Sequence, residues 1–583
     1  MPGSQFQSEI SAGQASQAAQ RGENSSTATP SRRAFLKGFG AATLAGAMPV
    51  VALAARGSGP DVISDTKSSQ LNIKARRTQA YRKRLAAAAE DRKSKTPVHP
   101  NNGDESLYPS GIANYTKGFP HDDFGEVDPT IYAAYLAAIK SGKRADFDAL
   151  ALGGTIPLVD PQAGLAFDLE TCDPSQNAIP SFDSLTSPGL AAQMIEAYWM
   201  ALTRDVPFSQ YDSDPTIAMA VAELNGLGSA YKGPNPVTTR SVFRGFTAGD
   251  LVGPFVSQFF LQPFNYGVMP FQGYMTTLPG DFGIDVDSFL NLQAGAPNGV
   301  PPENPAPTLK YLPDGRALAE YVHNDVLYQE YLNAALMLLK MGAPLNPSNP
   351  YAPLGTSLKS ETGFITFGLP MIEVLVAEVM ARALKNAWFQ KWFVHRMARA
   401  EETAGLVHFT KTGVKSYPLH PSLLNSRAAA TVFGRYGNWF LPQSYPEGCP
   451  LHPSYPSGHA TAAGAAVTVL KWFFDETAVF GKAASNGKTL SKPLTTIDDG
   501  SGPVTYSGGD ADQLTIGAEL NKLASNVGVG RAFAGIHWRQ DFQQAMLLGE
   551  RVAINLLQDQ GHLYNENYTG FSFTGFTGNT IKV

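Results

Sequence analysis

The sequence predicts a mainly α-helical protein, a large helical-bundle domain with long loops and minor β hairpins. Three observations lead to this class. From about residue 130 onward, apolar residues recur at intervals of three and four in one segment after another. The 583 residues include 42 prolines and 56 glycines, which indicates long, structured connections. The last residues, 571–583, alternate apolar and polar side chains and predict a small edge hairpin.

The first 54 residues predict a disordered n-region followed by a twin-arginine signal peptide. Arg32 and Arg33 stand just before residues 35–37, Phe-Leu-Lys, and a stretch of small apolar residues follows, with a plausible cleavage site at 52–54. This arrangement predicts export by the twin-arginine pathway to the periplasm or the outside of the cell. A membrane anchor is the alternative, but the stretch is short and rich in Gly and Ala rather than Leu.

The rest of the chain divides into three parts. Residues 55–125 predict an N-terminal arm with loops, and its basic segment 67–95 predicts one exposed helix. Residues 126–565 predict the α-helical catalytic domain, and residues 566–583 a C-terminal tail. No helical segment is a clean run of 18 apolar residues, so we expect no membrane span in the mature protein. The expected helices lie within residues 131–142, 190–205, 317–342, 370–405, 459–475 and 511–558.

Composition limits the classes of function. Hydrophobic residues make up 43% of the chain and charged residues 16%, which excludes disorder over most of its length. Forty-five basic residues against 50 acidic ones give a net charge of −5, so no global charge attracts nucleic acid or anionic lipid. The two cysteines, Cys172 and Cys449, have no metal-binding spacing, and they are either a disulfide or two buried thiols.

Three separated segments carry groups that bind oxyanions, and the first is "KWFVHRMARAEE". Lys391, His395 and Arg399 are spaced four apart. On a continuous helix each step of four rotates by about 40°, so Lys391 and Arg399 would share one face with His395 between them. We therefore expect two cations to point into one cavity.

The second segment is "HPSYPSGHA", which runs from His452 into a predicted helix. Pro456 stops what precedes it, so Ser457 and Gly458 are expected at the helix N-terminus, where free N–H groups and the helix dipole favour an anion. Glycine permits close approach of the backbone, and the serine hydroxyl can donate a hydrogen bond. His459 would stand at the rim as an acid or a base.

The third segment is "GVGRAFAGIHWRQDFQQA". Arg531 is expected in a turn bounded by glycines, and His537 follows six residues later. Asp541 lies four residues beyond His537, where a carboxylate can accept the Nδ1 proton and leave Nε2 free as a ligand or nucleophile. Taken singly, each of the three signals has an ordinary explanation: a solvated helix face, a helix cap or a surface contact.

Together and in this order, the segments resemble the vanadium haloperoxidase and type-2 phosphatidic-acid-phosphatase superfamily. That pattern is Lys and Arg, then Pro-Ser-Gly-His, then Arg, five residues, His, three residues and Asp. The length of the chain and His452, seven residues before His459, are similar to the algal and cyanobacterial bromoperoxidase branch. Ala400 departs from the proline that many relatives carry after the arginine.

The resemblance implies a vanadate cofactor and a fold of the vanadium haloperoxidase and acid phosphatase type. It implies that vanadate oxygens are held by Lys391, Arg399, Ser457, Gly458 and Arg531. His537 would be the metal ligand, oriented by Asp541, and His395 would support the site from outside. The catalytic residues would be His459 as the base toward hydrogen peroxide, Lys391, which also polarises the peroxide, His537, and His452, which tunes the choice of halide.

The implied reaction is oxidation of bromide by hydrogen peroxide to hypobromous acid, which halogenates small organic substrates. Homo-oligomers and a structural calcium are also implied, although the sequence offers no decisive carboxylate cluster for calcium. An acid phosphatase acting through a phosphohistidine at His537 is the main alternative, and an exported phosphate-binding protein is another. The remaining histidines are expected to be structural: His99, His121, His323, His408, His420 and His562.

Overall fold

The computed structural model describes residues 72–296, 302–352 and 360–583. The predicted signal peptide, and the export that it implies, lie outside the described residues and stay predictions. The described residues from 86 to 583 form one compact unit, and residues 72–85 belong to another. The basic segment forms helix α3 (Ile73–Asp91), in which no side chain is buried, as predicted. The domain boundaries at 125 and 565 stay predictions.

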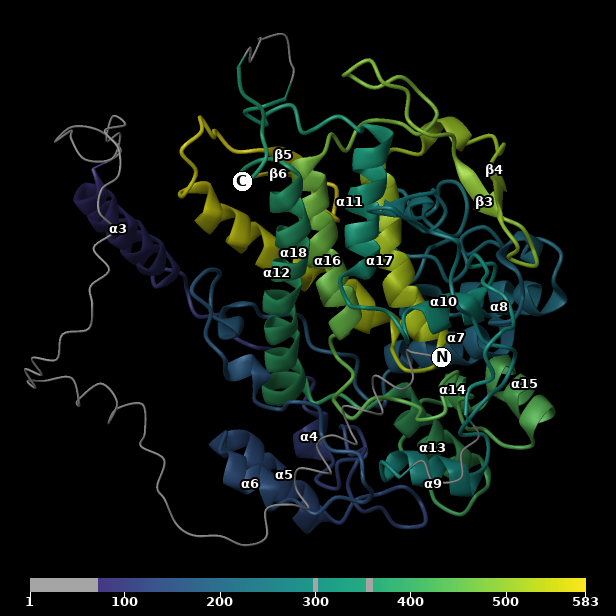
Figure 1. Cartoon of the computed structure of the whole chain (residues 1–583). Helices are drawn as coiled ribbons and strands as arrows, with labels where there is room; N and C mark the ends of the chain where they lie inside the picture. The colour runs from purple at the N-terminus through teal and green to yellow at the C-terminus, as the bar shows by residue number, and fades with distance from the viewer. Residues whose placement is uncertain (1–71, 297–301, 353–359) are drawn as a thin grey trace, which may run out of the picture. The chain divides into compact units, whose positions relative to one another are not determined.

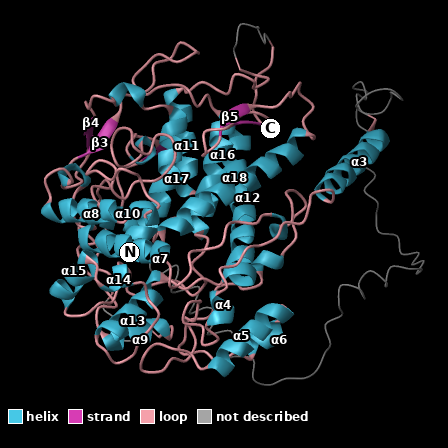
Figure 2. Cartoon of the chain, turned by 180° about the vertical axis from the view of Figure 1, so that it is seen from behind, coloured by secondary structure: helices cyan, strands magenta, loops and turns pink. Residues whose placement is uncertain are grey.

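The fold is mainly α-helical, as predicted, and Figure 2 shows helices joined by long loops. Three two-stranded antiparallel hairpins accompany the helices: β1–β2 (Asn265–Tyr266, Met269–Pro270), β3–β4 (Leu494–Thr496, Pro503–Thr505) and β5–β6 (Ser572–Thr574, Thr580–Lys582). The last is the hairpin expected in the tail. The helices from α4 onward are α4 (Asp104–Leu107), α5 (Pro129–Ser141), α6 (Arg144–Asp148), α7 (Pro188–Thr203), α8 (Pro215–Gly226), α9 (Val286–Gln293), α10 (Gly315–Tyr321), α11 (Gln329–Met341), α12 (Leu369–Phe389), α13 (Ala400–Lys411), α14 (Pro421–Leu424), α15 (Arg427–Tyr436), α16 (Gly458–Phe473), α17 (Ile516–Phe533) and α18 (Arg539–Gly561).

Local sequence explains where several helices begin. The helices α5, α7 and α8 each start with proline at the first position, where the missing N–H costs nothing. The residue before each proline caps the helix, since the side chains of Asp128, Ser187 and Asp214 accept hydrogen bonds from backbone N–H groups of the first turn.

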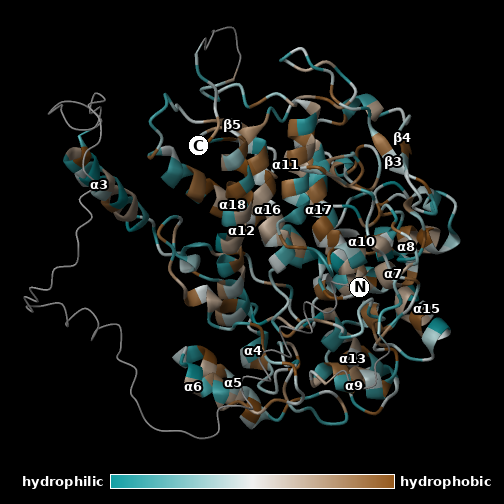
Figure 3. Cartoon of the chain, viewed as in Figure 1, coloured by the Kyte–Doolittle hydropathy of each residue, from teal (hydrophilic) through white to brown (hydrophobic). Residues whose placement is uncertain are grey.

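The centre of the larger unit is helix α16, which packs against α12, α17 and α18 (Figure 1). Every residue of α16 except His459 is buried, and Figure 3 shows the helix coloured as apolar along most of its length. Glycines allow α16 and α18 to touch closely. A Cβ on Gly464 would lie 2.2 Å from the Met546 carbonyl oxygen, and one on Gly549 would lie 2.0 Å from that of Thr461.

Three of the predicted helices are interrupted, and each interruption carries polar residues of the site described below. The segment 317–342 forms α10 and α11, with residues 322–328 between them, and 511–558 contains both α17 and α18, with a break at 534–538. The segment 370–405 is broken at 390–399. Apolar periodicity continues across each break, which is why the sequence pattern predicts continuous helices there.

Two further expectations can be compared with the structure. Cys172 and Cys449 are free thiols, so of the two alternatives the disulfide is wrong. None of the helices in the described residues combines the length and the apolarity that crossing a bilayer requires.

The contact between α16 and α18 generates a stability prediction. Gly549→Ala places a methyl group against the Thr461 backbone, so we expect the free energy of unfolding to fall by about 1–3 kcal/mol. Gly434→Ala on the exposed side of α15, where a Cβ meets nothing within 4 Å, is the matched control and should stabilise by up to about 1 kcal/mol. Urea unfolding measures both, and equal effects of the two substitutions would contradict the close packing.

Candidate active site

The first predicted segment does not form a continuous helix. After α12 the chain makes a π-helical turn over Gln390–His395, and Arg396 then adopts a left-handed conformation with φ of 43°. Arg399 caps the start of α13 instead of ending α12, so the expectation that Lys391 and Arg399 share a helix face is wrong. Ala400 occupies the first position of α13, where proline is also favoured, so this departure leaves the helix start intact.

Lys391 and Arg399 nevertheless reach the same loop. Lys391 Nζ donates to the carbonyl oxygens of Pro453 at 2.6 Å and Ser454 at 2.7 Å. Arg399 Nε and Nη2 donate to the carbonyl oxygen of His452 at 3.0 and 2.8 Å. Both cations are fully buried. Thus the loop before α16 gathers the two side chains that the sequence predicted to meet.

His395 turns away from these two cations. Its ring lies edge-on to Tyr455, with 4.7 Å between ring centroids, and its Nε2 is buried without a hydrogen-bond partner among the described residues. Burial, followed by the charges of His99 and Arg396, lowers the pKa of His395 to about 3, so the ring is neutral at pH 7. Among the described residues no hydrogen bond joins the His395 ring to Lys391 or Arg399, and the ring packs on Tyr455 of the loop instead.

Ser457 caps helix α16, as predicted, because its Oγ accepts from the Ala460 N–H at 3.4 Å. Gly458 is the first residue of the helix, and its N–H has no partner within the helix. A Cβ at Gly458 would lie 2.9 Å from Trp388 Cζ3, so only glycine lets the indole approach the helix end. The same indole also faces Lys391, whose Nζ lies 5.8 Å from the Trp388 ring centroid, so Trp388 lies beside both the start of α16 and this cation.

Arg531 lies in the last turn of α17 rather than in a turn between glycines, so that expectation is wrong. The apolar pattern on both sides, through Phe533, keeps the helix running past the two glycines. Arg531 Nη1 donates to the Val322 carbonyl at 2.7 Å and to the Tyr445 hydroxyl at 3.4 Å. Its Nε is buried and has no partner in the described part of the chain.

His537 and Asp541 form the predicted pair across the start of α18. His537 Nδ1 lies 2.6 Å from Asp541 Oδ2, and the same carboxylate accepts from the Trp538 N–H and the Ser454 hydroxyl. Arg399 Nη1 lies 3.2 Å from His537 Nε2. With the Nδ1 proton donated to Asp541, Nε2 carries the lone pair.

The charges around His537 keep its ring neutral. Burial, followed by the nearby charges of Arg399, Lys391 and Arg531, lowers its pKa well below the usual value. Burial raises the pKa of Asp541 to about 6, against the opposing hydrogen bond from Ser454 and the charge of Lys391. At neutral pH the pair is therefore a neutral imidazole beside a carboxylate, which suits Nε2 to binding an electrophilic atom.

His452 and His459 each contact a residue of the site or of the break between α10 and α11. His452 Nδ1 lies 3.0 Å from Arg399 Nη2, and its ring centroid lies 4.8 Å from that of Trp388. His459 Nε2 lies 3.1 Å from Asp325 Oδ1, and 21% of the His459 side chain is exposed to solvent. Burial lowers the pKa of His459, while the charge of Asp325 opposes the shift. The role of His452 in halide choice stays a prediction.

Sequence reasoning missed Asp325 and Tyr445, and it treated His323 as structural. Asp325 lies in the break between α10 and α11, 134 residues before its partner His459, and no spacing signals such a pair. Tyr445 accepts a hydrogen bond from Arg531 and stacks on His323, with 3.7 Å between ring centroids. The ring of Tyr445 therefore separates His323 from Arg531. His323 also lies within a group of carboxylates.

The electrostatics of the cavity indicate an oxyanion. Lys391, Arg399 and Arg531 are buried, and among the described residues none of them forms an ion pair with a carboxylate. Burial and then the charge of Arg399 lower the pKa of Lys391 well below its usual value. One nearby carboxylate, Asp541, does not balance three buried cations, and a tetrahedral oxyanion would supply both further negative charge and acceptors. The unpartnered Nε of Arg531 and the open end of α16 fit such a group.

Comparisons with known proteins agree with this geometry. A vanadium-dependent bromoperoxidase from Corallina pilulifera is 33% identical over 611 residues, covering 88% of this chain and 99% of that protein. One from Ascophyllum nodosum is 34% identical over 534 residues, covering 87% of this chain and 92% of that protein. The chain belongs to the vanadium-dependent bromoperoxidase family.

The family assignment is supported at the level of the fold. Residues 434–566, which include the second and third predicted segments, match a family model described as the VCPO second helical-bundle domain. The structure resembles that of a homohexameric second vanadate-dependent bromoperoxidase from Ascophyllum nodosum, with a TM-score of 0.81 and 29% identity, covering 95% of this chain and 96% of that one. The predicted helical-bundle fold of the vanadium haloperoxidases is therefore confirmed.

The contact between Asp325 and His459 generates a titration prediction. Asp325 favours the protonated imidazole, so Asp325→Asn should move the pKa of His459 further below its usual value. NMR of protein labelled with ¹³C-histidine measures this titration, and His459→Gln assigns the signal. Asp498→Asn on the exposed surface should leave the titration in place. A pKa of His459 that stays constant or rises in Asp325→Asn would contradict the assigned contact.

Proposed function

We propose that this chain is a vanadium-dependent bromoperoxidase, which oxidises bromide with hydrogen peroxide to hypobromous acid. The observation that carries the proposal is the burial of three cations, unpaired with carboxylates in the described chain, around an imidazole whose Nε2 is held unprotonated. Overall, bromide, peroxide and one proton give hypobromous acid and water, and hypobromous acid then halogenates small organic substrates. The names of the relatives support this activity.

The residues of the chain would hold vanadate in the following way. His537 Nε2 would be the protein ligand to the metal, with its orientation fixed by the bond from Nδ1 to Asp541. The oxygen atoms would be held by the cations and by the open end of α16, a set that comprises Lys391, Arg399, Arg531, Ser457 and Gly458. Bound vanadate(V) supplies a Lewis acid that activates peroxide without changing its oxidation state.

His459 is the base that accepts a proton from hydrogen peroxide. Because Nε2 of the neutral ring can donate to Asp325, Nδ1 keeps the lone pair and can take a proton from hydrogen peroxide. Asp325 acts through this ring as a positioning residue. The partial exposure of His459 gives peroxide access to the base, while Lys391 and Arg399 remain dry.

A phosphatase of the same superfamily would use the same groups, with His537 as nucleophile and His459 as the acid for the leaving group. The match over almost the whole length of bromoperoxidase relatives favours the oxidative reaction. A phosphate-binding protein without catalysis would have no use for the His459–Asp325 pair.

One assay separates these functions. Metal-stripped protein given vanadate, peroxide and bromide should brominate a phenol indicator, and His537→Ala should reduce this rate to that of the sample without vanadate. His420→Asn, which retains a capping side chain at the start of α14, should keep wild-type activity. Vanadate-independent rates together with hydrolysis of a phosphomonoester would instead establish the phosphatase.

We also propose that the chain forms a homo-oligomer, because the similar bromoperoxidase structure from Ascophyllum nodosum is homohexameric. Light scattering coupled to size exclusion should give a mass several times that of one chain at micromolar concentration. A mass equal to one chain over the whole concentration range would contradict this proposal.

A further inference from the structure

A group of titratable side chains beside the active site takes no part in the proposed reaction. Glu320 lies in the last turn of α10, His323 follows two residues after the helix ends, and Glu303 arrives from the segment before α10. One ligand atom of each residue lies within 4.8 Å of the others. Atoms bound to a common ion at about 2.1 Å lie roughly 3 to 4 Å apart, so these spacings are those of a metal site.

The atoms at the centre of this group are not satisfied by hydrogen bonds. His323 Nδ1 lies 2.8 Å from Glu303 Oε1 and 3.9 Å from Glu320 Oε2. His323 Nδ1 and Glu303 Oε1 are both buried, and the short ion pair between them is their contact within the described part of the chain, since neither atom has a hydrogen-bond partner there. Glu320 is only 6% exposed. Buried polar atoms without hydrogen bonds need an explanation, and a cation that contacts both atoms from one side would satisfy them.

The outer contacts of the group are those of metal ligands. His323 Nε2 lies 2.6 Å from Glu447 Oε1, so that carboxylate can hold the ring with Nδ1 directed to the group. The Asn324 side-chain amide donates to Glu320 Oε1 at 2.6 Å, which leaves Oε2 toward the centre. A histidine that binds a metal through one nitrogen commonly donates its other N–H to a carboxylate in this way.

The charge of the region favours a cation. No lysine or arginine of the described chain forms an ion pair with Glu303, Glu320 or Glu447. A bound cation would replace the proton at Nδ1.

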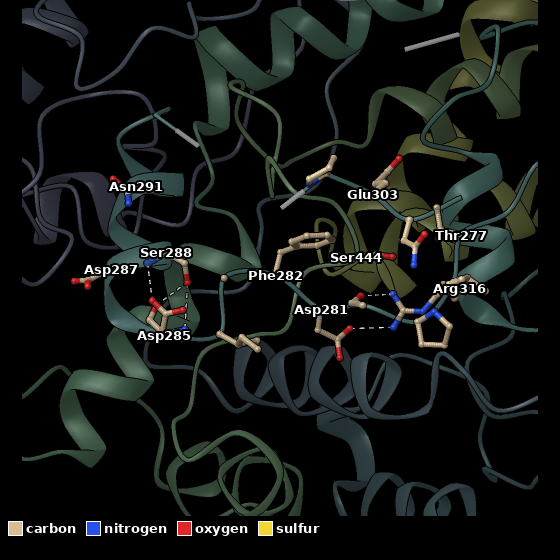
Figure 4. Close-up of a pocket in the computed structure, with 17 residues that line it drawn as sticks. Thr277, Asp281, Phe282, Asp285, Asp287, Ser288, Asn291, Glu303, Arg316 and Ser444 are labelled. Carbon is tan, nitrogen blue, oxygen red and sulfur yellow. Dashed lines mark hydrogen bonds and ion pairs between the residues drawn. The ribbon is translucent and has the colours of Figure 1, made fainter. Parts of the chain in front are cut away.

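Figure 4 shows a cavity that borders the group at Glu303. Glu303 lines a cavity of about 480 Å³, with Phe282 in its middle and Ser444, next to Tyr445, on its wall. Asp285 and Asp287 line the same cavity, and in the described chain neither carboxylate forms an ion pair. Arg316 also reaches it, but two aspartates neutralise this guanidinium. Carboxylates around a cavity raise the local concentration of cations.

We propose that Glu303, Glu320 and His323 bind one divalent transition-metal cation of the Zn²⁺ or Mn²⁺ class. An imidazole nitrogen beside carboxylate oxygens suits these ions, whereas Ca²⁺ and Mg²⁺ prefer oxygen ligands alone. The ion joins the segment that carries Glu303 to α10. It also fixes His323 against Tyr445, whose hydroxyl accepts from Arg531, so it supports one cation of the oxyanion site. The proposal does not rest on the peroxidase activity.

Equilibrium dialysis of the full chain against Zn²⁺ or Mn²⁺, followed by elemental analysis, tests this site. Wild-type protein should bind one equivalent more than His323→Gln or Glu320→Gln. Glu447→Gln should keep the site with an affinity roughly 10- to 100-fold weaker, because it removes only the outer contact. His537→Ala should retain the full equivalent, which separates this site from the imidazole of the active site.

Asp287→Asn, which removes a carboxylate from the cavity but not from the group, is the matched control and should bind as wild type does. Circular dichroism without metal confirms that each variant is folded, and Co²⁺ in place of Zn²⁺ gives visible absorption bands that report on the imidazole ligand. Equal metal content in wild type, His323→Gln and Glu320→Gln would overturn the proposal. A preference for Ca²⁺ over both Zn²⁺ and Mn²⁺ would overturn the assigned class of ion.

Discussion

Three buried cations that no described carboxylate pairs with are the constraint on which the rest of the site depends. Lys391 and Arg399 direct their hydrogen bonds to backbone carbonyls of the loop 452–454, and Arg531 directs one to Val322. Carbonyls orient a cation but do not cancel its charge, so repulsion among the three persists. The fold therefore holds positive charge away from solvent, and a tetrahedral oxyanion would balance that charge.

The loop before α16 is the part of the fold that assembles this cavity. Its carbonyls receive Lys391 and Arg399, its Ser454 hydroxyl donates to Asp541, and the Ser457 N–H donates to the Asp541 carbonyl at 3.2 Å. Asp541 thus joins the loop to the imidazole of His537. Gly464 and Gly549 permit a close contact between α16 and α18. This contact fixes Ser457, at the start of α16, relative to Asp541, in the first turn of α18.

The break between α10 and α11 also contributes residues that contact the site. Within a few residues it supplies Asp325, which contacts His459, and His323, which stacks on Tyr445 beside Arg531. Two groups of opposite function, a proton acceptor and an anion-binding guanidinium, therefore depend on one short connection. A cation bound at His323 would stiffen this connection from outside the cavity.

The sequence by itself determined the helical class, the cap at Ser457 and the pairing of His537 with Asp541, because each depends on periodicity or on contacts within one turn. The order and spacing of the three segments also singled out Lys391, Arg399 and Arg531 as the cations of one site, and their roles there stay a prediction. Only the tertiary structure decided that Lys391 and Arg399 meet across a π-helical break and that Arg531 projects from a helix. The same holds for the contacts of Asp325, His323 and Glu303, because they join residues far apart in the chain. Long-range contacts depend on how the helices pack, and local sequence patterns do not predict that packing.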